Sequence, residues 1–188
     1  KEKAMLETLE RELSEGRRVL VFSHHIEVMP RLARIIEENL GIKVPILEST
    51  KVPTAKRQSW IDSKVVAKSA KVMVTNPICI QTGLNNLVYF HSMWWHENPA
   101  CNAIVKRQAE GRLDRIGQTK EVRSYFPVIN GSLQTHLHSL LLHKVAVSMA
   151  TDGLDAETAL QAAGVGDSGV VTGFSVGRIL YDIITKGG

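Results

Sequence analysis

The chain has 188 residues, of which 44% are apolar, so it is long enough to bury a core and to form one domain with a small appendage. No apolar run approaches the roughly 20 residues that a membrane-spanning helix needs, and no signal peptide opens the chain, so we expect a soluble intracellular protein without a membrane partner. The 23 Lys and Arg residues against 19 Asp and Glu residues give a net charge of +4, which is compatible with a polyanionic partner without establishing one.

The apolar residues switch between helix and strand spacing along the chain. Leu6, Leu9 and Leu13 follow one another at intervals of three and four, the period of an amphipathic helix that ends at Gly16. The next segment is a short β-branched run of the kind found in strands buried on both faces. The spacing predicts strands at 18–23, 43–49, 71–75, 87–95 and 121–129, and helices at 5–16, 29–41, 54–70, 98–115 and 132–150. Strands that alternate with helices at these lengths predict a doubly wound α/β domain, with a mostly parallel sheet covered by helices on both faces.

Strand signals stop after Gly131. A short helix is predicted at 154–164, and the Gly-, Ser- and Val-rich stretch 165–177 is compatible with a loop, a linker or an irregular hairpin. We therefore expect a domain over residues 1–150 and a helical or partly flexible extension over 151–188. The chain opens with Lys-Glu-Lys and has its first methionine at position 5, from which we expect a piece of a longer protein.

Metal and disulfide chemistry are not indicated. Cys79 and Cys101 lack CxxC spacing, so free thiols are expected. His136 and His138 lie two apart on a predicted helix and would point in different directions, so no metal site is expected.

Polar residues follow the predicted strands. In a parallel sheet, ligands gather at the carboxyl ends of the strands. Ser23 and His24 follow the first strand, and Thr75 ends the third, ahead of a loop that carries Thr82, Gly83 and Asn85. Hydroxyl, amide and glycine backbone groups in such turns can bind phosphate oxygens without supplying charge.

The helix after the fourth strand carries cations on one face. Gln108, Arg112 and Arg115 are spaced by four and three residues, so they can converge on one ligand. A guanidinium suits phosphate because its planar donors bind in pairs and its charge does not titrate. The alternative is that both arginines complement the negative end of the helix dipole or pair with Glu110 and Asp114. Composition alone favours this alternative.

Several stretches together resemble a known family. QAEGRLDRIGQ (108–118) resembles motif VI of superfamily two helicases, and its ending is most similar to the Swi/Snf group of DNA-translocating ATPases. RVLVFSHH (18–25) resembles motif IV, and TGLNN (82–86) resembles the Gly-Leu-Asn-Leu of motif V.

The resemblance continues in the family's order. Trp95 with Asn98 and Pro99 resembles the Trp-Asn-Pro of the group, and Arg57 resembles the arginine that opens the helix after the second strand. NGSLQTHLHSLLLHK (130–144) resembles the helical brace that follows motif VI.

This resemblance implies the second of two RecA-like lobes, with ATP in the cleft between them. It implies Arg115 as the arginine finger, Arg112 as a second γ-phosphate or cross-lobe contact, and Gln108 as a link between nucleotide state and lobe closure. It also implies that Gly83 and Asn85 contact nucleotide or magnesium. The implied DNA-phosphate contacts are Ser23, His24, Thr75 and Thr82.

The phosphate-binding loop GxxxxGK[ST] is not in the sequence. The resemblance therefore implies that ATP and Mg²⁺ are bound mainly by an N-terminal RecA-like lobe of the same protein, with double-stranded DNA as the other partner. The isolated chain is expected to hydrolyse little or no ATP.

Some positions depart from the family pattern. Asn86 stands in place of Leu in motif V, Gln81 and Thr82 stand where glycines are usual, and Asp114 replaces a frequent His. Two rival hypotheses therefore stay open, a strand-separating superfamily two helicase and a nucleic-acid-binding module without catalysis. Gln118 and the Trp95 region favour the translocase over the first rival.

Two neighbouring pairs have simpler interpretations. Lys106 and Arg107 are expected to form a solvated face, with DNA contact as the alternative. Of Trp94 and Trp95, at least one is expected in the core, with base stacking as the alternative.

Overall fold

The structure is a computed structural model that describes residues 1–81, 84, 87–97, 102–129, 132–155 and 158–159. The chain divides into two compact units. The first comprises residues 1–99 and 105–127, and the second comprises residues 100–104 and 128–188. Among the described residues, no helix is both long enough and apolar enough to cross a membrane.

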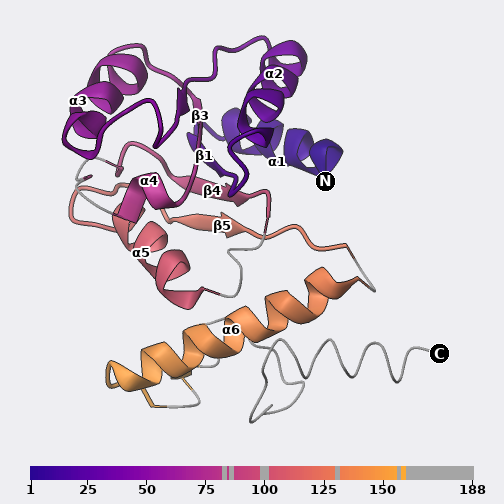
Figure 1. Ribbon diagram of the computed structural model, residues 1–188, viewed down its shortest axis with the longest axis vertical. Helices are drawn as coiled ribbons and strands as arrows, with labels where there is room; N and C mark the ends of the chain where they lie inside the picture. The colour runs from indigo at the N-terminus through magenta and orange to yellow at the C-terminus, as the bar shows by residue number, and fades with distance from the viewer. Residues whose placement is uncertain (82–83, 85–86, 98–101, 130–131, 156–157, 160–188) are drawn as a thin grey trace. The chain divides into compact units, whose positions relative to one another are not determined.

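The first unit is built on a five-stranded sheet in the order β2-β3-β1-β4-β5, and every pair of neighbouring strands is parallel (Figure 1). The strands are β1 (Val19–Phe22), β2 (Ile46–Leu47), β3 (Val72–Thr75), β4 (Ser92–Trp95) and β5 (Arg123–Tyr125). The central strand β1 places Val19 opposite Val72 on one side and opposite Ser92 on the other. This arrangement confirms the predicted doubly wound α/β fold with a parallel sheet.

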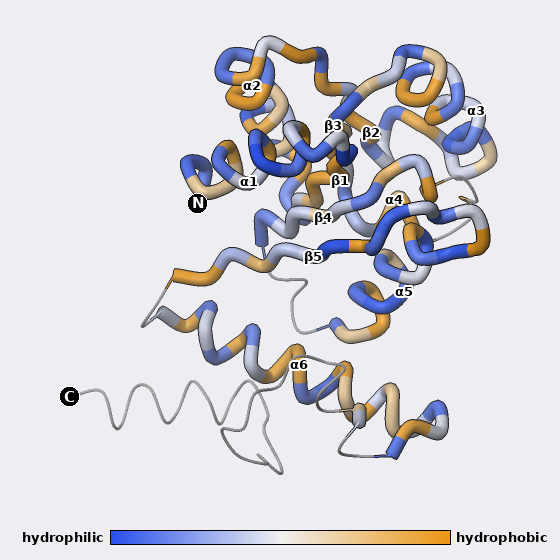
Figure 2. Tube along the Cα trace, turned by 180° about the vertical axis from the view of Figure 1, so that it is seen from behind, coloured by the Kyte–Doolittle hydropathy of each residue, from blue (hydrophilic) through white to orange (hydrophobic). Residues whose placement is uncertain are grey.

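The side chains of successive residues in each strand point to opposite faces of the sheet. Val19 and Val21 pack on the face covered by α1 (Glu2–Ser14) and α2 (Val28–Leu40). Both helices alternate polar and apolar residues along their length (Figure 2), as expected for elements with one buried face. The helix α2 ends at Gly41, whose φ of 64° is a left-handed conformation that glycine adopts without steric cost.

Leu20 and Phe22 pack on the other face, which holds the larger apolar core. The helical elements on this side all contribute residues to that core except the first, η1, which has no buried residue. They are the 3₁₀ turn η1 (Thr54–Lys56), α3 (Arg57–Ile61), the π-helical segment η2 (Asp62–Val66), α4 (Ile78–Gln81) and α5 (Ala103–Leu113). Trp94 and Trp95 are both buried, one on each face, so both belong to the core.

The strands are shorter than the apolar runs that predicted them. The run 87–95 forms a strand only from Ser92, because the Phe90 N–H bonds back to the Leu87 carbonyl (3.0 Å) and closes a turn. At the edge, β5 covers only part of 121–129, since its partner β4 offers three residues in register. An apolar run does not reveal where its neighbour in the sheet begins or ends.

The helix predicted over 54–70 forms in three pieces. Its last turn is π-helical, with the Ala67 N–H donating to the carbonyl of Asp62, five residues earlier (2.9 Å). It stops at Ser69, which has a φ of 51° and so cannot continue a right-handed helix.

The second unit contains α6 (Leu133–Thr151), as predicted over 132–150. Ser132 caps its start, where the serine Oγ accepts a hydrogen bond from the Gln134 N–H (3.2 Å). Most of the short helix predicted over 154–164, and the whole of 165–177, lie outside the described residues. The proposed extension over 151–188 stays a prediction.

One carboxylate joins α1 to the sheet. Glu12 is 0% exposed, and its Oε2 accepts from Arg17 Nε (2.8 Å) and from the Ser92 hydroxyl. Its Oε1 accepts from Arg123 Nη1 (2.9 Å) and from the Tyr125 hydroxyl (2.6 Å). A single side chain of α1 is thereby bonded to Arg17, two residues before β1, and to both β4 and β5.

The protonation of Glu12 follows from these contacts. Burial raises the pKa of this carboxyl, but the hydrogen bonds from Ser92, Tyr125, Arg123 and Arg17 outweigh burial and lower the pKa to about 2. The folded-state pKa lies below the unfolded value. The group therefore contributes its full stabilisation above about pH 5, and that contribution is lost as the pH falls toward 2.

We expect Glu12→Gln to lower the free energy of unfolding by about 3 kcal/mol at pH 7, because the buried Arg17 loses its counter-charge. Urea unfolding at a series of pH values from 7 to 2.5 measures the free energy of unfolding of both proteins. The difference between the variant and wild type should become smaller below about pH 4.5. Glu10→Gln, which makes the same charge change on the exposed side of α1, is the control and should stay within about 0.5 kcal/mol of wild type. A gap that is independent of pH would contradict the assigned role of the charge.

Candidate functional site

The turns at the carboxyl ends of β1, β3 and β4 are bonded to one another. The Ser23 hydroxyl donates to Glu97 Oε1 (3.1 Å), and Glu97 Oε2 accepts from the backbone N–H of His24 (2.9 Å). Asn76 donates from Nδ2 to the His24 carbonyl (2.9 Å), and its Oδ1 accepts from the Ile78 N–H (2.9 Å). One carboxylate and one amide therefore fix the three turns as a unit.

The predicted phosphate contacts in this region have different exposures. Ser23 and Thr75 are fully buried, and the Thr75 hydroxyl donates to the Leu47 carbonyl (2.9 Å). A phosphate would have to replace these internal bonds to reach either hydroxyl, so their contacts with DNA stay predictions.

His24 is half-buried, and its Nε2 has no hydrogen-bond partner among the described residues. Burial lowers the pKa of His24, which the charge of Glu97 offsets only in part, so the ring is neutral at pH 7. A contact from His24 to phosphate would therefore rely on a hydrogen bond rather than on charge.

Sequence reasoning missed Glu97. This residue lies in the turn that follows β4, and inspection of the residues after every strand, the rule that selected Ser23, would have found it. Its carboxylate places a negative charge beside the turn that was predicted to contact DNA.

The arginine helix α5 ends at the amino ends of the strands, opposite the turns described above. Its last turn lies beside the segment that leads into β4, because Arg112 Nη1 donates to the Leu84 carbonyl (2.9 Å). The following connection reaches the residues before β1, where Lys120 Nζ donates to the Gly16 carbonyl (2.8 Å). The structure therefore brings Arg112 and Arg115 together, and separates them from Ser23, His24 and Thr75 by the length of the strands.

Within this group the arginines differ in exposure. Arg112 is half-buried through its contact with Leu84, whereas Arg115 is exposed and its Nε donates to the Gly111 carbonyl one turn earlier (3.0 Å). Gln108 is also exposed. The guanidinium of Arg115 thus faces solvent at the end of the helix, where it can meet an anion without breaking a buried contact.

The acidic neighbour proposed for the arginines has another partner. Glu110 pairs with Lys106 Nζ (2.8 Å), which also lies 5.3 Å from the centre of the Phe126 ring. Lys106 is only 8% exposed, so the expectation that it forms a solvated face was wrong. Its aliphatic stem is covered, and its charge is satisfied by a carboxylate and an aromatic face.

Gln118 locks the end of α5 in place. Its Nε2 donates to the carbonyls of Phe90 (2.9 Å) and Leu113 (3.0 Å), and its Oε1 accepts from the Thr119 N–H (3.0 Å). Gly117, immediately before it, has a φ of 102°, which a residue with a side chain rarely adopts. The Gly-Gln pair therefore turns the chain after the arginines and ties it to the residues before β4.

Arg57 anchors α4, the helix that precedes the segment containing Leu84. It is buried, and its Nη1 donates to the carbonyl of Cys79 in α4 (3.2 Å), just before the loop predicted to contact nucleotide. Within that loop, Thr82, Gly83 and Asn85 lie outside the described residues.

The comparisons with known proteins give related sequences and folds. No protein-family model matches the chain. A Xenopus tropicalis protein named SWI/SNF-related matrix-associated actin-dependent regulator of chromatin subfamily A-like protein 1 is 31% identical over 152 residues, 77% of this chain and 15% of that protein. The ATP-dependent helicase fft3 of Schizosaccharomyces pombe is 28% identical over 151 residues, 78% of this chain and 15% of its own length. The chain thus spans about 15% of the length of these curated relatives.

Solved structures share the fold. The C-terminal part of the Fun30 ATPase domain has a TM-score of 0.68 and 22% identity, covering 98% of this chain and 53% of that one. The Sulfolobus solfataricus SWI2/SNF2 ATPase core in complex with dsDNA has a TM-score of 0.56 and 23% identity, covering 87% of this chain and 33% of that one.

We expect Gln118→Ala to lower the free energy of unfolding by about 2 kcal/mol, because it leaves inward-facing backbone carbonyls without a donor. Gln118→Glu should cost at least as much, since a carboxylate oxygen would face the same carbonyls. Chemical denaturation checks both variants, with Gln108→Ala on the exposed face of α5 as the control. If Gln118→Glu left the free energy of unfolding unchanged, the amide donor would not be what holds the turn.

Proposed function

Since this chain is a C-terminal RecA-like lobe of the Swi/Snf family, we propose that it is the second motor lobe of an ATP-dependent double-stranded DNA translocase. The observation that carries the proposal is the exposed guanidinium of Arg115 beside the anchored Arg112 at the end of α5. Buried arginines of the same unit, such as Arg17 and Arg57, are bonded to internal partners instead.

The nucleotide part of the proposal assigns different work to the two arginines. Arg115 reaches across the cleft to the γ-phosphate as the arginine finger, and Gln108 on the same helix senses lobe closure. ATP supplies the phosphoryl group whose transfer drives the cycle, and Mg²⁺ neutralises charge on its phosphates. Because the sequence has no phosphate-binding loop, both are held mainly by the N-terminal RecA-like lobe, with Gly83 and Asn85 contributing from this side.

Arg112 has a coupling role in this proposal. Its bond to the Leu84 carbonyl ties the arginine helix to the loop over 82–86. Movement of that helix on lobe closure would therefore be passed to the loop, whose Thr82 is a proposed DNA contact. Closure and opening would then tighten and release the grip on DNA in alternation.

The DNA part rests on the turns after β1 and β3, with His24 as the more exposed donor and Ser23 and Thr75 behind it. One structural neighbour, the Sulfolobus solfataricus ATPase core, is in complex with dsDNA, which supports a duplex as the partner. The carboxylate of Glu97 in the same turns opposes phosphate binding, so the contact would be weak enough to be broken in every cycle.

We expect Arg115→Ala, in the full-length protein with its N-terminal lobe, to lower the DNA-stimulated ATPase rate by about 10³-fold or more, because charge on the transferring phosphoryl group loses its stabilisation. Steady-state ATP hydrolysis with saturating duplex DNA measures the rate. Duplex binding, measured by fluorescence anisotropy, should stay within about twofold of wild type, since the finger faces nucleotide rather than DNA.

Arg34→Ala is the matched control. Arg34 is an exposed arginine on α2, 3.9 Å from Glu38, and its loss should not change hydrolysis. A rate for Arg115→Ala within about twofold of wild type would remove the finger assignment. Efficient strand displacement by the wild-type protein would favour the helicase alternative, because a duplex translocase consumes ATP without separating the strands.

A further inference from the structure

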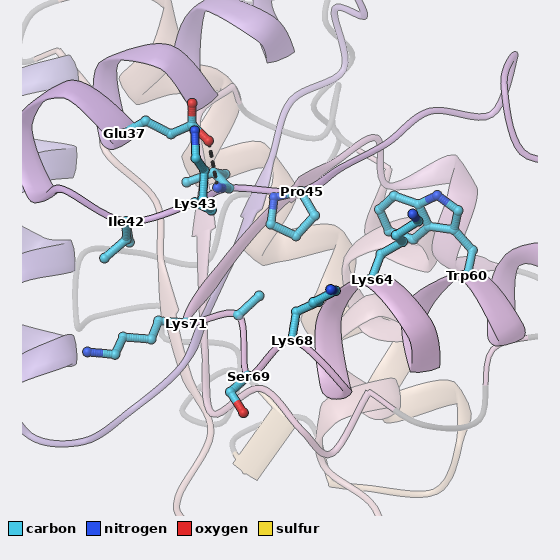
Figure 3. Close-up of a pocket in the computed structure, with 11 residues that line it drawn as sticks. Glu37, Ile42, Lys43, Pro45, Trp60, Lys64, Lys68, Ser69 and Lys71 are labelled. Atoms are coloured by element: carbon cyan, nitrogen blue, oxygen red, sulfur yellow. Dashed lines mark hydrogen bonds between the residues drawn. The ribbon is translucent and has the colours of Figure 1, made fainter.

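A basic pocket of about 650 Å³ lies beside the loops that lead into β2 and β3 (Figure 3). One wall is the segment after α2, which carries Lys43 and Pro45. The other wall is the end of the α3–η2 helix and the turn that follows, which carry Trp60, Lys64 and Lys68. None of these residues belongs to the arginine group or to the turns around Ser23.

Hydrogen bonds fix both walls of the pocket. The Val44 N–H donates to Glu37 Oε1 (2.9 Å), and the Pro45 carbonyl accepts from the Val74 N–H in β3 (3.0 Å). On the opposite side, the Ala70 carbonyl accepts from the Tyr89 hydroxyl (3.1 Å). The pocket therefore belongs to the framework of the fold rather than to a loose surface loop.

The charge of the pocket is strongly positive. Four lysines line it, at positions 43, 64, 68 and 71, against a single acidic residue, Glu37. All four lysines are exposed, and the Glu37 carboxylate already accepts from a backbone N–H. An anionic ligand is therefore favoured.

The floor of the pocket is apolar and aromatic. Trp60 is half-buried against the core, so part of its indole remains open to the pocket, with Pro45 nearby. Figure 3 shows Lys64 and Lys68 extending toward Trp60 and Pro45, whereas Lys71 points away from them. The pocket thus offers an aromatic surface with the ammonium groups of Lys64 and Lys68 beside it and a third, that of Lys71, directed away from it.

We propose that this pocket binds single-stranded nucleic acid, with an unpaired base stacked on Trp60 and the strand's phosphates along Lys64, Lys68 and Lys71. A planar base suits the indole, and stacking is possible only when the face of the base is not covered in a duplex. Lys64 and Lys68 lie on the Trp60 side of the pocket and Lys71 points the other way, so the three do not converge on one point, which fits successive phosphates of a strand better than one isolated anion. An acidic peptide would satisfy the lysines but would leave the aromatic surface unused.

The test uses the full-length protein without nucleotide and a fluorescein-labelled oligothymidylate, with binding measured by anisotropy across a salt series. Lys64→Glu with Lys68→Glu should weaken binding at least about tenfold at 0.1 M salt and flatten the salt dependence, since each lost phosphate contact removes about 0.7 from the logarithmic slope. Trp60→Ala should weaken binding about fivefold to a hundredfold. Trp60→Phe, which keeps an aromatic face, should restore most of it.

Lys3→Glu with Lys144→Glu is the matched control, because it makes the same change of net charge at exposed helical positions outside the pocket. An oligonucleotide carrying 5-iodouracil should photocrosslink to Trp60, which peptide mass spectrometry would locate. Duplex-stimulated ATP hydrolysis should be retained in the pocket variants and would show that they are folded.

Three results would overturn the proposal. Equal losses in the pocket and control variants would mean that only overall charge matters. If the pocket variants lost as much affinity for a duplex of the same sequence as for the single strand, the pocket would be part of a general DNA surface. Competition by thymidine monophosphate at the same nucleotide concentration would identify a single nucleotide, not a strand, as the ligand.

Discussion

The buried carboxylate of Glu12 holds the sheet and its first helix in one arrangement. The unit has few residues per strand, and β5 contributes only three, so ladder hydrogen bonds alone give its edge little support. Glu12 compensates because its two oxygens accept from groups before β1, on β4 and on β5. The position of β5 in turn sets where the connection from α5 must end, and so where the arginines lie.

The two proposed contact regions lie at opposite ends of the strands. The connection from β3 to β4 runs from the carboxyl ends to the amino ends, since Asn76 belongs to the carboxyl-end turns and Leu84 accepts the hydrogen bond of Arg112. This connection therefore links the turns predicted to contact DNA to the arginines proposed to contact nucleotide, through the hydrogen bond from Arg112 to Leu84. In the translocase proposed above, a change at the nucleotide would have to pass along such a link to alter the DNA contacts.

Much of the fold could be predicted from the sequence, because strands buried on both faces appear as unbroken apolar runs and amphipathic helices follow each of them. The site was predicted less completely. The spacing of Arg112 and Arg115 placed them on one face, but it did not show that their helix ends beside Leu84 rather than Ser23. The i,i+4 spacing of Lys106 and Glu110 and the place of Glu97 after β4 were both readable in the sequence, whereas the burial of Lys106 against Phe126 and the bond from Ser23 to Glu97 join residues far apart in the chain. The predictions for Thr82, Gly83 and Asn85 fall outside the described residues.

The three tryptophans differ sharply in their surroundings, which has a practical use. Trp94 and Trp95 are enclosed by the core, and the Trp95 ring stacks on Phe126 with 5.5 Å between ring centres, whereas Trp60 is half-buried and lines the pocket. Iodide or acrylamide should therefore quench emission from Trp60 selectively, while the other two indoles report loss of the native core. The chain thus carries its own optical probes, one for occupancy of a surface hollow and two for global integrity, and no added dye is needed to tell these events apart.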